Sequence, residues 1–271
     1  MKNYAKIANS LRQEVVLMCH RGRSAHVGTS LSAADIVTIL YEDVLRVNPK
    51  NPNWPNRDRF IVSKGHGAAI IYAALAHKGF FPKSWLKTYY QNDGKLAGHV
   101  TKLNIPGIEF STGSLGHGLP LGCGVALAGK RDNKKYRVFV LLSDGELDEG
   151  SNWEAILFAQ HYKLDNLVAI VDYNKIQSLD FVKNIINLEP LKKKLQAFNW
   201  EVKEVDGHNH NELRRVLKKV PFKKGKPSFL IAHTVKGKGV SFMENTVKWH
   251  YANTDEVLLK QALDELKINI L

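Results

Sequence analysis

The chain has 271 residues, 44% of them hydrophobic and 24% charged, which is enough apolar material for a sizeable core and argues against wholesale disorder. Its formal charge of +13 leaves an anionic substrate, an acidic partner chain or nucleic acid as binding targets. Because the basic residues are scattered, specific nucleic-acid binding is the least favoured of these. No apolar run approaches the length that spans a bilayer, so we expect no membrane segment.

Cysteine usage points to a reducing compartment. Cys19 and Cys123 are the two cysteines and form no CxxC pair, which argues against a disulfide framework and a thiolate metal site. The N-terminal sequence MKNYAKIANSLRQEVV lacks the unbroken apolar stretch of a signal peptide. We therefore expect a cytoplasmic protein.

The N-terminal part of the chain is predicted to be helical. A first helix has an apolar face formed by Ile7, Leu11, Val15 and Met18. Gly22 is placed to end this helix. Ser32 and Asp35 have the spacing of a capping box, which predicts a second helix as far as about Leu45. The stretch 46–59 contains three prolines and many polar residues, which indicates a long surface loop.

From residue 60 onward, short apolar runs alternate with helical segments. The predicted strands are Phe60–Val62, Arg137–Leu142, Leu167–Asp172, Val202–Val205 and Phe229–Ala232. The predicted helices are Ala68–His77, Lys83–Tyr90, Leu119–Gly129, Asn152–His161, Pro190–Phe198, Asn211–Lys218 and Asp255–Leu266. Continuous apolar runs are typical of strands buried on both faces. The pattern predicts an α/β fold with a mostly parallel sheet and helices on both faces, in one domain spanning 1–271.

Two polar residues follow consecutive strands of this predicted sheet. Asp144 comes after the strand that ends near Leu142, and Asn174 comes after the next strand. Ligands of open parallel sheets bind beyond the carboxyl ends of the strands, where these side chains would meet if the strands are neighbours. A carboxylate and an amide oxygen suit Mg²⁺ or Ca²⁺, and Mg²⁺ also takes phosphate oxygens. The alternative is that both are ordinary turn residues.

Gly145 would let a ligand approach the backbone closely, and Ser151 with Glu154 predicts a capping box for the following helix. Together with the acid and the amide, these features indicate a metal-bridged diphosphate site.

Several motifs resemble the transketolase family. SDGELDEGSNWEAILFAQHYKLDNLVAIVDYN is similar to the thiamine diphosphate motif that begins with GDG and ends in Asn. Within it, DGELDEGSNWEA and HYKLDNLVAIVDYNKIQ resemble transketolases in particular. SAHVGTSLSAADI, FIVSKGHGAAIIYA and STGSLGHGLPLGCGVALAGK resemble further family segments, so the likeness extends over nearly the whole chain. It implies the diphosphate-binding (PP) domain of a thiamine diphosphate enzyme.

The resemblance assigns roles to individual residues. Asp144 and Asn174 would ligate Mg²⁺, or Ca²⁺ in its place, through their side chains, and Ile176 would do so through its carbonyl. The cofactor itself would be contacted by Gly113, Ser114, Leu115, Gly145, His66 and His250. The substrate channel would be lined by His26, His99 and His250, which with His66 are the candidate catalytic residues.

Imidazoles suit such a site because their unperturbed pKa is close to neutral pH. The role of His117 is open, since full-length relatives usually carry glutamine there, and Glu149 resembles an acidic residue at the interface between subunits. Departures from the family pattern include Ser143 for the first glycine of GDG and Tyr251 after His250, and they bear on the substrate more than on the cofactor.

The family needs a second α/β domain that carries the glutamate bonded to the aminopyrimidine ring. This chain ends at Leu271 without a second strand–helix series. The resemblance therefore implies the N-terminal subunit of a split transketolase, completed by a separate C-terminal subunit in an α2β2 assembly. It would transfer a two-carbon ketol unit from a ketose (phosphate) to an aldose (phosphate), in the pentose phosphate pathway or in catabolism of unusual sugars.

Other functions remain open at this point. The α subunit of a 2-oxo-acid dehydrogenase also carries a GDG…N half-site on a separate chain, and a synthase that joins pyruvate to an aldehyde phosphate is a further alternative. A basic nucleic-acid-binding module would instead show salt-dependent affinity for nucleic acid and indifference to thiamine diphosphate.

Overall fold

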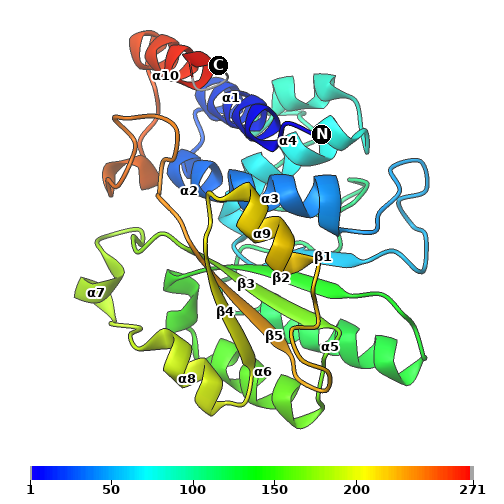
Figure 1. Cartoon of the computed structure of the whole chain (residues 1–271). Coiled ribbons are helices and arrows are strands. Elements are labelled where there is room, and N and C mark those ends of the chain that lie inside the picture. Colours follow the sequence, from blue (N-terminus) through cyan, green and yellow to red (C-terminus); the bar gives the residue numbers. More distant parts are fainter. Residues whose placement is uncertain (1, 269–271) are drawn as a thin grey trace.

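Five strands form a single parallel sheet in the computed structural model, which describes residues 2–268 (Figure 1). They are β1 (Arg59–Val62), β2 (Val138–Ser143), β3 (Leu167–Tyr173), β4 (Glu201–Asp206) and β5 (Ser228–His233). Their spatial order is β1-β2-β3-β5-β4, and each neighbouring pair runs parallel. All five predicted strands are confirmed to within one residue at each end. Four of them are apolar runs buried in the sheet, and β4, at the sheet edge, is partly exposed.

Helices cover both faces of the sheet, which confirms the predicted α/β class (Figure 1). One face carries α1 (Tyr4–Gly22), α2 (Val27–Ser32), α3 (Ala34–Ile39), α4 (Ala68–Lys78) and α9 (His210–Leu217), and the other carries α5 (Gly118–Arg131), α6 (Gly150–His161), α7 (Val182–Ile185) and α8 (Leu191–Ala197). The last helix, α10 (Glu256–Ile268), lies against α1.

Alternate residues of the central strands pack into two separate hydrophobic cores. In β2, Phe139 and Leu141 pack with the helices around α1, whereas Val138, Val140 and Leu142 pack with α5 and α6. This is the period of two expected for a strand buried on both faces. The sheet is therefore held from both sides, and its carboxyl edge is the part available for a binding site.

The N-terminal helices differ from the prediction. The first helix is confirmed as α1, but the capping box at Ser32 and Asp35 is wrong. Ser32 is the last residue of α2, and its hydroxyl lies 3.0 Å from Thr29 O and 2.5 Å from Asp172 Oδ2. Asp35 pairs with a buried arginine instead of capping α3. After α3, the chain continues as a π-helical turn, Leu40–Val44, and then as the predicted loop.

The predicted helix Lys83–Tyr90 is a shorter 3₁₀ helix, Lys83–Thr88. Leu86 and Tyr89 are each 2% exposed, and this three-residue spacing of buried side chains matches the 3₁₀ repeat rather than the α-helical one. Two further 3₁₀ turns, Gly65–Gly67 and Gly145–Asp148, follow β1 and β2, and a third covers Lys248–His250.

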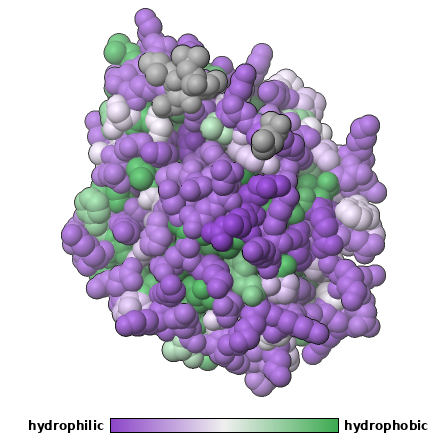
Figure 2. Space-filling view, in the orientation of Figure 1, coloured by the Kyte–Doolittle hydropathy of each residue, from purple (hydrophilic) through white to green (hydrophobic). Residues whose placement is uncertain are grey.

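Within residues 2–268, none of the helices has the length and apolarity that crossing a membrane would require. The face seen in Figure 2 is mostly hydrophilic, with hydrophobic surface in scattered patches.

Candidate functional site

Asp144 and Asn174 lie together at the carboxyl edge of the sheet. Ser143 at the end of β2 is paired with Asp172 in β3, so the residues that follow these strands emerge side by side. Asp144 Oδ2 accepts a hydrogen bond of 2.5 Å from the backbone of Lys175, directly after Asn174. Both side chains, with Ile176, line a cavity of about 340 Å³, which we call the edge cavity.

The oxygen donors at this edge fit a hard divalent cation. Asp144 is 2% exposed and Asn174 is 5% exposed, and Asn174 Oδ1 lies 3.1 Å from the backbone nitrogen of Ile176. Burial, followed by the nearby charge of Asp172, raises the pKa of Asp144 to about 7. A cation beside this carboxylate would offset both effects. Among residues 2–268 no cluster of three or more His, Cys, Asp or Glu side chains is arranged for a metal, so a site here would combine carboxylate, amide and carbonyl oxygens.

Lys236 places a buried ammonium group in the wall of the edge cavity. It is 1% exposed, and its Nζ donates to Ile176 O at 3.1 Å and to Gln177 O at 2.8 Å. Its Nζ also lies 2.9 Å from His250 Nδ1. Burial lowers the pKa of Lys236 to about 8. The ammonium remains mostly protonated at pH 7, so this wall of the cavity attracts an anion.

A second buried lysine lies beneath the edge cavity. Lys64 Nζ and Asp172 Oδ2 are 2.5 Å apart, and both side chains are fully buried. Asp172 also accepts hydrogen bonds from Ser32 and Thr234. Lys64 therefore offsets part of the repulsion between Asp172 and Asp144.

The four predicted histidines converge on the same cavity. The ring of His26 lies 5.2 Å from that of His66, 5.7 Å from that of His99 and 4.9 Å from that of His250. Burial is the main cause that lowers the pKa of His26 to about 4 and of His250 to about 3, and it also lowers the pKa of His66. These three rings are neutral at pH 7 and can both accept and donate hydrogen bonds.

His26 has two features that are common at functional sites. Its backbone is left-handed, with φ of 72°, which is uncommon for a residue other than glycine. Its Nδ1 is buried without a hydrogen-bond partner among the described residues. A buried ring nitrogen in this state has a hydrogen bond to offer to a bound hydroxyl group.

The glycine-rich loop before α5 forms another part of the cavity wall. Gly113 and Leu115 line the cavity, whereas Ser114 is exposed and is not part of its wall. His117 is exposed as well, and its Nδ1 lies 3.1 Å from Leu115 O. Gly145 lines the cavity, and a Cβ atom there would lie 2.7 Å from the side chain of Gln177.

The predicted capping box at Ser151 and Glu154 is wrong. The residue before α6 is Glu149, which is exposed and makes no capping hydrogen bond through its side chain. Ser151 Oγ instead donates to Gly116 O at 2.8 Å. The serine thus holds the glycine-rich loop rather than the end of its own helix.

Comparison with known proteins shows the family of this chain. Residues 3–269 match the family described as "Transketolase, thiamine diphosphate binding domain". The chain belongs to the transketolase family. Its fold agrees, since a transketolase from Campylobacter jejuni superimposes with a TM-score of 0.91 at 32% identity, over 98% of this chain.

Transketolase relatives of two sizes match the chain. A subunit of apulose-4-phosphate transketolase from Actinobacillus succinogenes is 45% identical over 265 residues, which cover 97% of this chain and 95% of the relative. A subunit of 6-deoxy-6-sulfo-D-fructose transketolase from a Clostridium species is 41% identical and covers 89% of this chain. In contrast, the chain spans only 41% of human transketolase, at 38% identity, and 43% of the Campylobacter enzyme. The chain therefore has the extent of the transketolase subunits, and the family favours ketol transfer over the 2-oxo-acid dehydrogenase alternative.

Sequence reasoning missed Lys236, Lys64 and Thr29, of which Lys236 and Thr29 line the edge cavity. Lys236 could have been found, because it lies three residues after β5 and β5 is a neighbour of β3. The rule that ligands bind beyond the carboxyl ends of parallel strands applies to it as well as to Asp144. Lys64 follows β1 in the same way.

Proposed function

We propose that this chain is the diphosphate-binding subunit of a two-subunit transketolase that transfers a two-carbon ketol unit. The supporting observation is that the acid–amide pair of Asp144 and Asn174 shares one cavity with a buried lysine and four histidines. An anion anchor and a set of neutral proton carriers are two of the functions that this reaction requires.

The residues at the sheet edge would hold the cofactor. Asp144, Asn174 and the carbonyl of Ile176 would ligate Mg²⁺, for which Ca²⁺ could substitute. Lys236 would face the negative charge of the diphosphate, and Gly145 would permit close approach of its backbone. Gly113, Ser114 and Leu115 would contact the cofactor mainly through backbone, and of the three Gly113 and Leu115 line the edge cavity.

Bound thiamine diphosphate supplies a nucleophilic carbon and an electron sink for cleaving the bond beside a ketose carbonyl. The protein's own contribution would be made by His26, His66, His99 and His250. Because burial keeps three of these rings neutral, each can accept a hydrogen bond from a sugar hydroxyl, and that contact is the path by which the proton would move. His26 is the first candidate, since its buried Nδ1 has no partner among the described residues.

For the substrates, we propose a ketose (phosphate) donor and an aldose (phosphate) acceptor. The relatives of matching length are named for apulose 4-phosphate and for a sulfofructose, both of which are anionic ketose derivatives. Catabolism of an unusual sugar is therefore a candidate role beside the pentose phosphate pathway. The cytoplasmic location expected from cysteine usage stays a prediction.

We propose that residues 1–271 form one domain and that a separate C-terminal subunit completes the site in an α2β2 assembly. Two groups of exposed apolar side chains are candidates for contact with that subunit. On and just after α6 they are Leu157, Phe158 and Tyr162, and in the stretch after β3 they are Leu179, Phe181, Ile185 and Ile186. The second group begins directly after Gln177 and Ser178, which line the edge cavity, and a partner there would also exclude water from the reaction. Glu149, exposed at the start of α6, fits an interface role.

The test is a reconstitution with the separately purified partner subunit. With thiamine diphosphate and Mg²⁺, the mixture should transfer a ketol unit from a ketose to an aldehyde, and the purified chain alone should not. Acylation of lipoamide by the mixture would favour the dehydrogenase alternative, and transfer by the isolated chain would refute the split enzyme.

The metal assignment has its own variant. Asp144→Ala should abolish Mg²⁺-dependent binding of thiamine diphosphate, because it removes the one carboxylate of the proposed donor set. Asp132→Ala, in the exposed turn after α5, is the matched control and should bind normally. Unchanged binding by Asp144→Ala would count against the site.

A further inference from the structure

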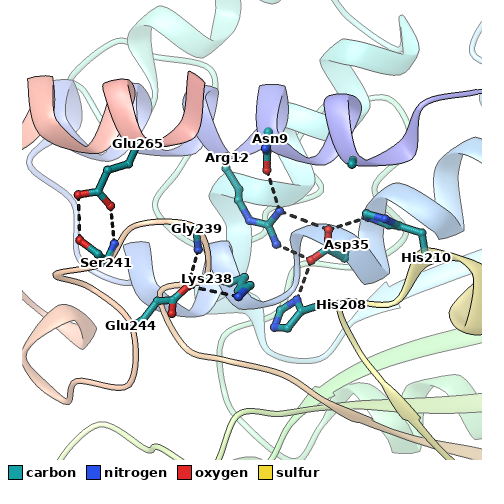
Figure 3. A pocket seen from close by; sticks show the side chains of 11 residues that line it. Asn9, Arg12, Asp35, His208, His210, Lys238, Gly239, Ser241, Glu244 and Glu265 are labelled. Atoms are coloured by element: carbon teal, nitrogen blue, oxygen red, sulfur yellow. Dashed lines mark hydrogen bonds and ion pairs between the residues drawn. The ribbon is translucent and has the colours of Figure 1, made fainter. Parts of the chain in front are cut away.

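A second cavity, of about 530 Å³, lies between α1, α3, the start of α9 and the segment 238–244. Figure 3 shows Arg12, His208 and His210 pointing toward Asp35 from separate elements. The side chains of Arg12 and Asp35 are each 4% exposed, and Arg12 binds both carboxylate oxygens, at 3.3 and 2.5 Å. His210 Nε2 lies 2.8 Å from Asp35 Oδ1. We call this set of four side chains the Asp35 network.

The remaining charged side chains in the wall of this cavity all have partners within the chain. Lys238 Nζ lies 3.4 Å from Glu244 Oε1, and Glu265 accepts hydrogen bonds from the backbone and hydroxyl of Ser241. None of these three side chains is left without a hydrogen bond or an ion pair.

His208 connects the Asp35 network to the segment that carries Lys236. The backbone N–H of Val235 donates to His208 Nε2 at 2.9 Å. Since a backbone N–H can only donate, Nε2 carries no proton and the ring is protonated at Nδ1. Nδ1 lies 2.7 Å from Asp35 Oδ2 and donates to it. Both ring nitrogens of His208 thus have partners. Asp35 orients the ring, and Arg12 in turn holds the carboxylate of Asp35 in place.

The segment after β5 depends on contacts to other parts of the chain, because residues 234–240 form neither helix nor strand. Beside Lys236, Gly237 donates to Gly28 O at 2.9 Å, and Asn245 donates to Lys236 O at 3.0 Å. The hydrogen bond to His208 is made by the residue directly before Lys236. It is therefore one of the contacts that fix the backbone from which the lysine side chain leaves.

We propose that His208, oriented by Asp35 and Arg12, is a positioning residue that aims the ammonium group of Lys236 at the diphosphate in the edge cavity. The inference rests on the proposed function, in which Lys236 faces the diphosphate. His208 itself lies outside the wall of the edge cavity. It acts on cofactor affinity only through the backbone of Val235.

The first experiment compares two substitutions in the full chain by titrating thiamine diphosphate in the presence of Mg²⁺. His208→Asn keeps an N–H near the position of Nδ1 but removes the acceptor for Val235. It should raise the Kd about threefold to tenfold, the effect of one net hydrogen bond on an equilibrium. His208→Gln places an oxygen near the position of Nε2 and should recover most of the affinity. His210→Asn, the matched control, alters the same carboxylate but not the contact to Val235, and should leave the Kd unchanged.

A double-mutant cycle separates positioning from general stability. In the background of Lys236→Met, His208→Asn should weaken binding no further, because its effect passes through the lysine. An equal loss in both backgrounds would overturn the proposal, as would equal affinities of His208→Asn and His210→Asn. If His208→Asn lowers the thermal transition too far for titration, His208→Gln is titrated in its place. A loss of thiamine diphosphate affinity in His208→Gln as large as the loss in Lys236→Met would then refute the positioning role.

Failure of the positioning role can be distinguished from failure of the proposed function. A wild-type chain that binds no thiamine diphosphate would overturn the proposed function itself. Normal wild-type binding that Lys236→Met weakens and His208→Asn does not would overturn the positioning role alone.

Discussion

Gly116 donates its backbone N–H to Glu146 Oε1 at 2.9 Å, which ties the glycine-rich loop to the turn after β2. The same carboxylate accepts hydrogen bonds from the backbone of Ser143 at 3.2 Å and from the hydroxyl of Ser63. Glu146 is fully buried, and burial raises its pKa although these donors work against the shift. One side chain thus joins the ends of β1 and β2 to the loop that lines the edge cavity.

Glu146→Gln should therefore loosen the glycine-rich loop. The new amide group would turn an N–H₂ donor toward a backbone donor, and a buried unsatisfied donor costs about 1–3 kcal/mol. We expect a loss of that size in the free energy of unfolding, measured with urea, and faster hydrogen exchange at Gly116. Glu154→Gln, exposed on α6, is the control and should stay within about 0.5 kcal/mol of wild type. Equal stability of the two variants would contradict the role of Glu146.

The buried ion pair of Lys64 and Asp172 should be costly to break from one side. Lys64→Met leaves a fully buried carboxylate without its cation and should reduce the free energy of unfolding by about 3–5 kcal/mol. The double variant Lys64→Met/Asp172→Asn removes that charge and should regain part of the loss. Chemical denaturation of the three proteins checks this order. A double variant less stable than Lys64→Met would show that the penalty does not come from the uncompensated charge.

Asp58 should make stability depend on pH at the acid end. Burial alone would raise its pKa, but hydrogen bonds from Arg137 and Arg46 hold the pKa below its ordinary value of 3.8. The folded state thus favours the carboxylate, and this stabilisation is present above pH 3.8 and is lost as the pH falls through the folded-state pKa.

The stability gap between wild type and Asp58→Asn should accordingly be widest near neutral pH and should narrow below about pH 4. Urea denaturation in a series of buffers measures it. A gap that stays constant to the lowest pH at which the protein folds would refute the assignment.

His26→Ala should impair catalysis without impairing the fold. General acid–base groups contribute roughly 10²–10⁴-fold, so we expect kcat/KM of the reconstituted enzyme to fall by at least about 10². Affinity for thiamine diphosphate and the thermal transition should change little, since His26 Nδ1 makes no hydrogen bond among the described residues. His161→Ala, exposed on α6, is the control. Near-normal turnover by His26→Ala would move the proton-transfer role to another histidine.

The lowered pKa values of two histidines lead to a prediction for the pH dependence of the rate. An ordinary imidazole with a pKa of 6.5 would gain a proton between about pH 7.5 and pH 5.5, but His26 and His250 have values of about 4 and 3. Substitution of either residue should leave the shape of the profile in this range unchanged while lowering the rate. If the wild-type rate changes with pH near 6.5 and this change is absent in His26→Ala, the imidazole of His26 has an ordinary pKa in the assembled enzyme.

Local sequence patterns were sufficient to predict the sheet and the acid–amide pair. The central strands are continuous apolar runs with polar turn residues after them, and this signal can be read without knowledge of the fold. Asp144 and Asn174 could be paired in advance because the ends of neighbouring parallel strands meet at one edge. The four histidines came from family resemblance, and the structure brings them together from loops that are far apart in the chain.

Only the tertiary structure decided which polar residues stabilise the fold and which line the edge cavity. Ser32 and Ser151 have capping spacing, yet their hydroxyls bind Asp172 and Gly116, because long-range donors and acceptors compete with local ones. Lys236 and His208 each look like surface residues in a basic chain. Their burial and their partners depend on segments as distant in sequence as the one that carries Asp35, and such contacts leave no periodic trace in the sequence.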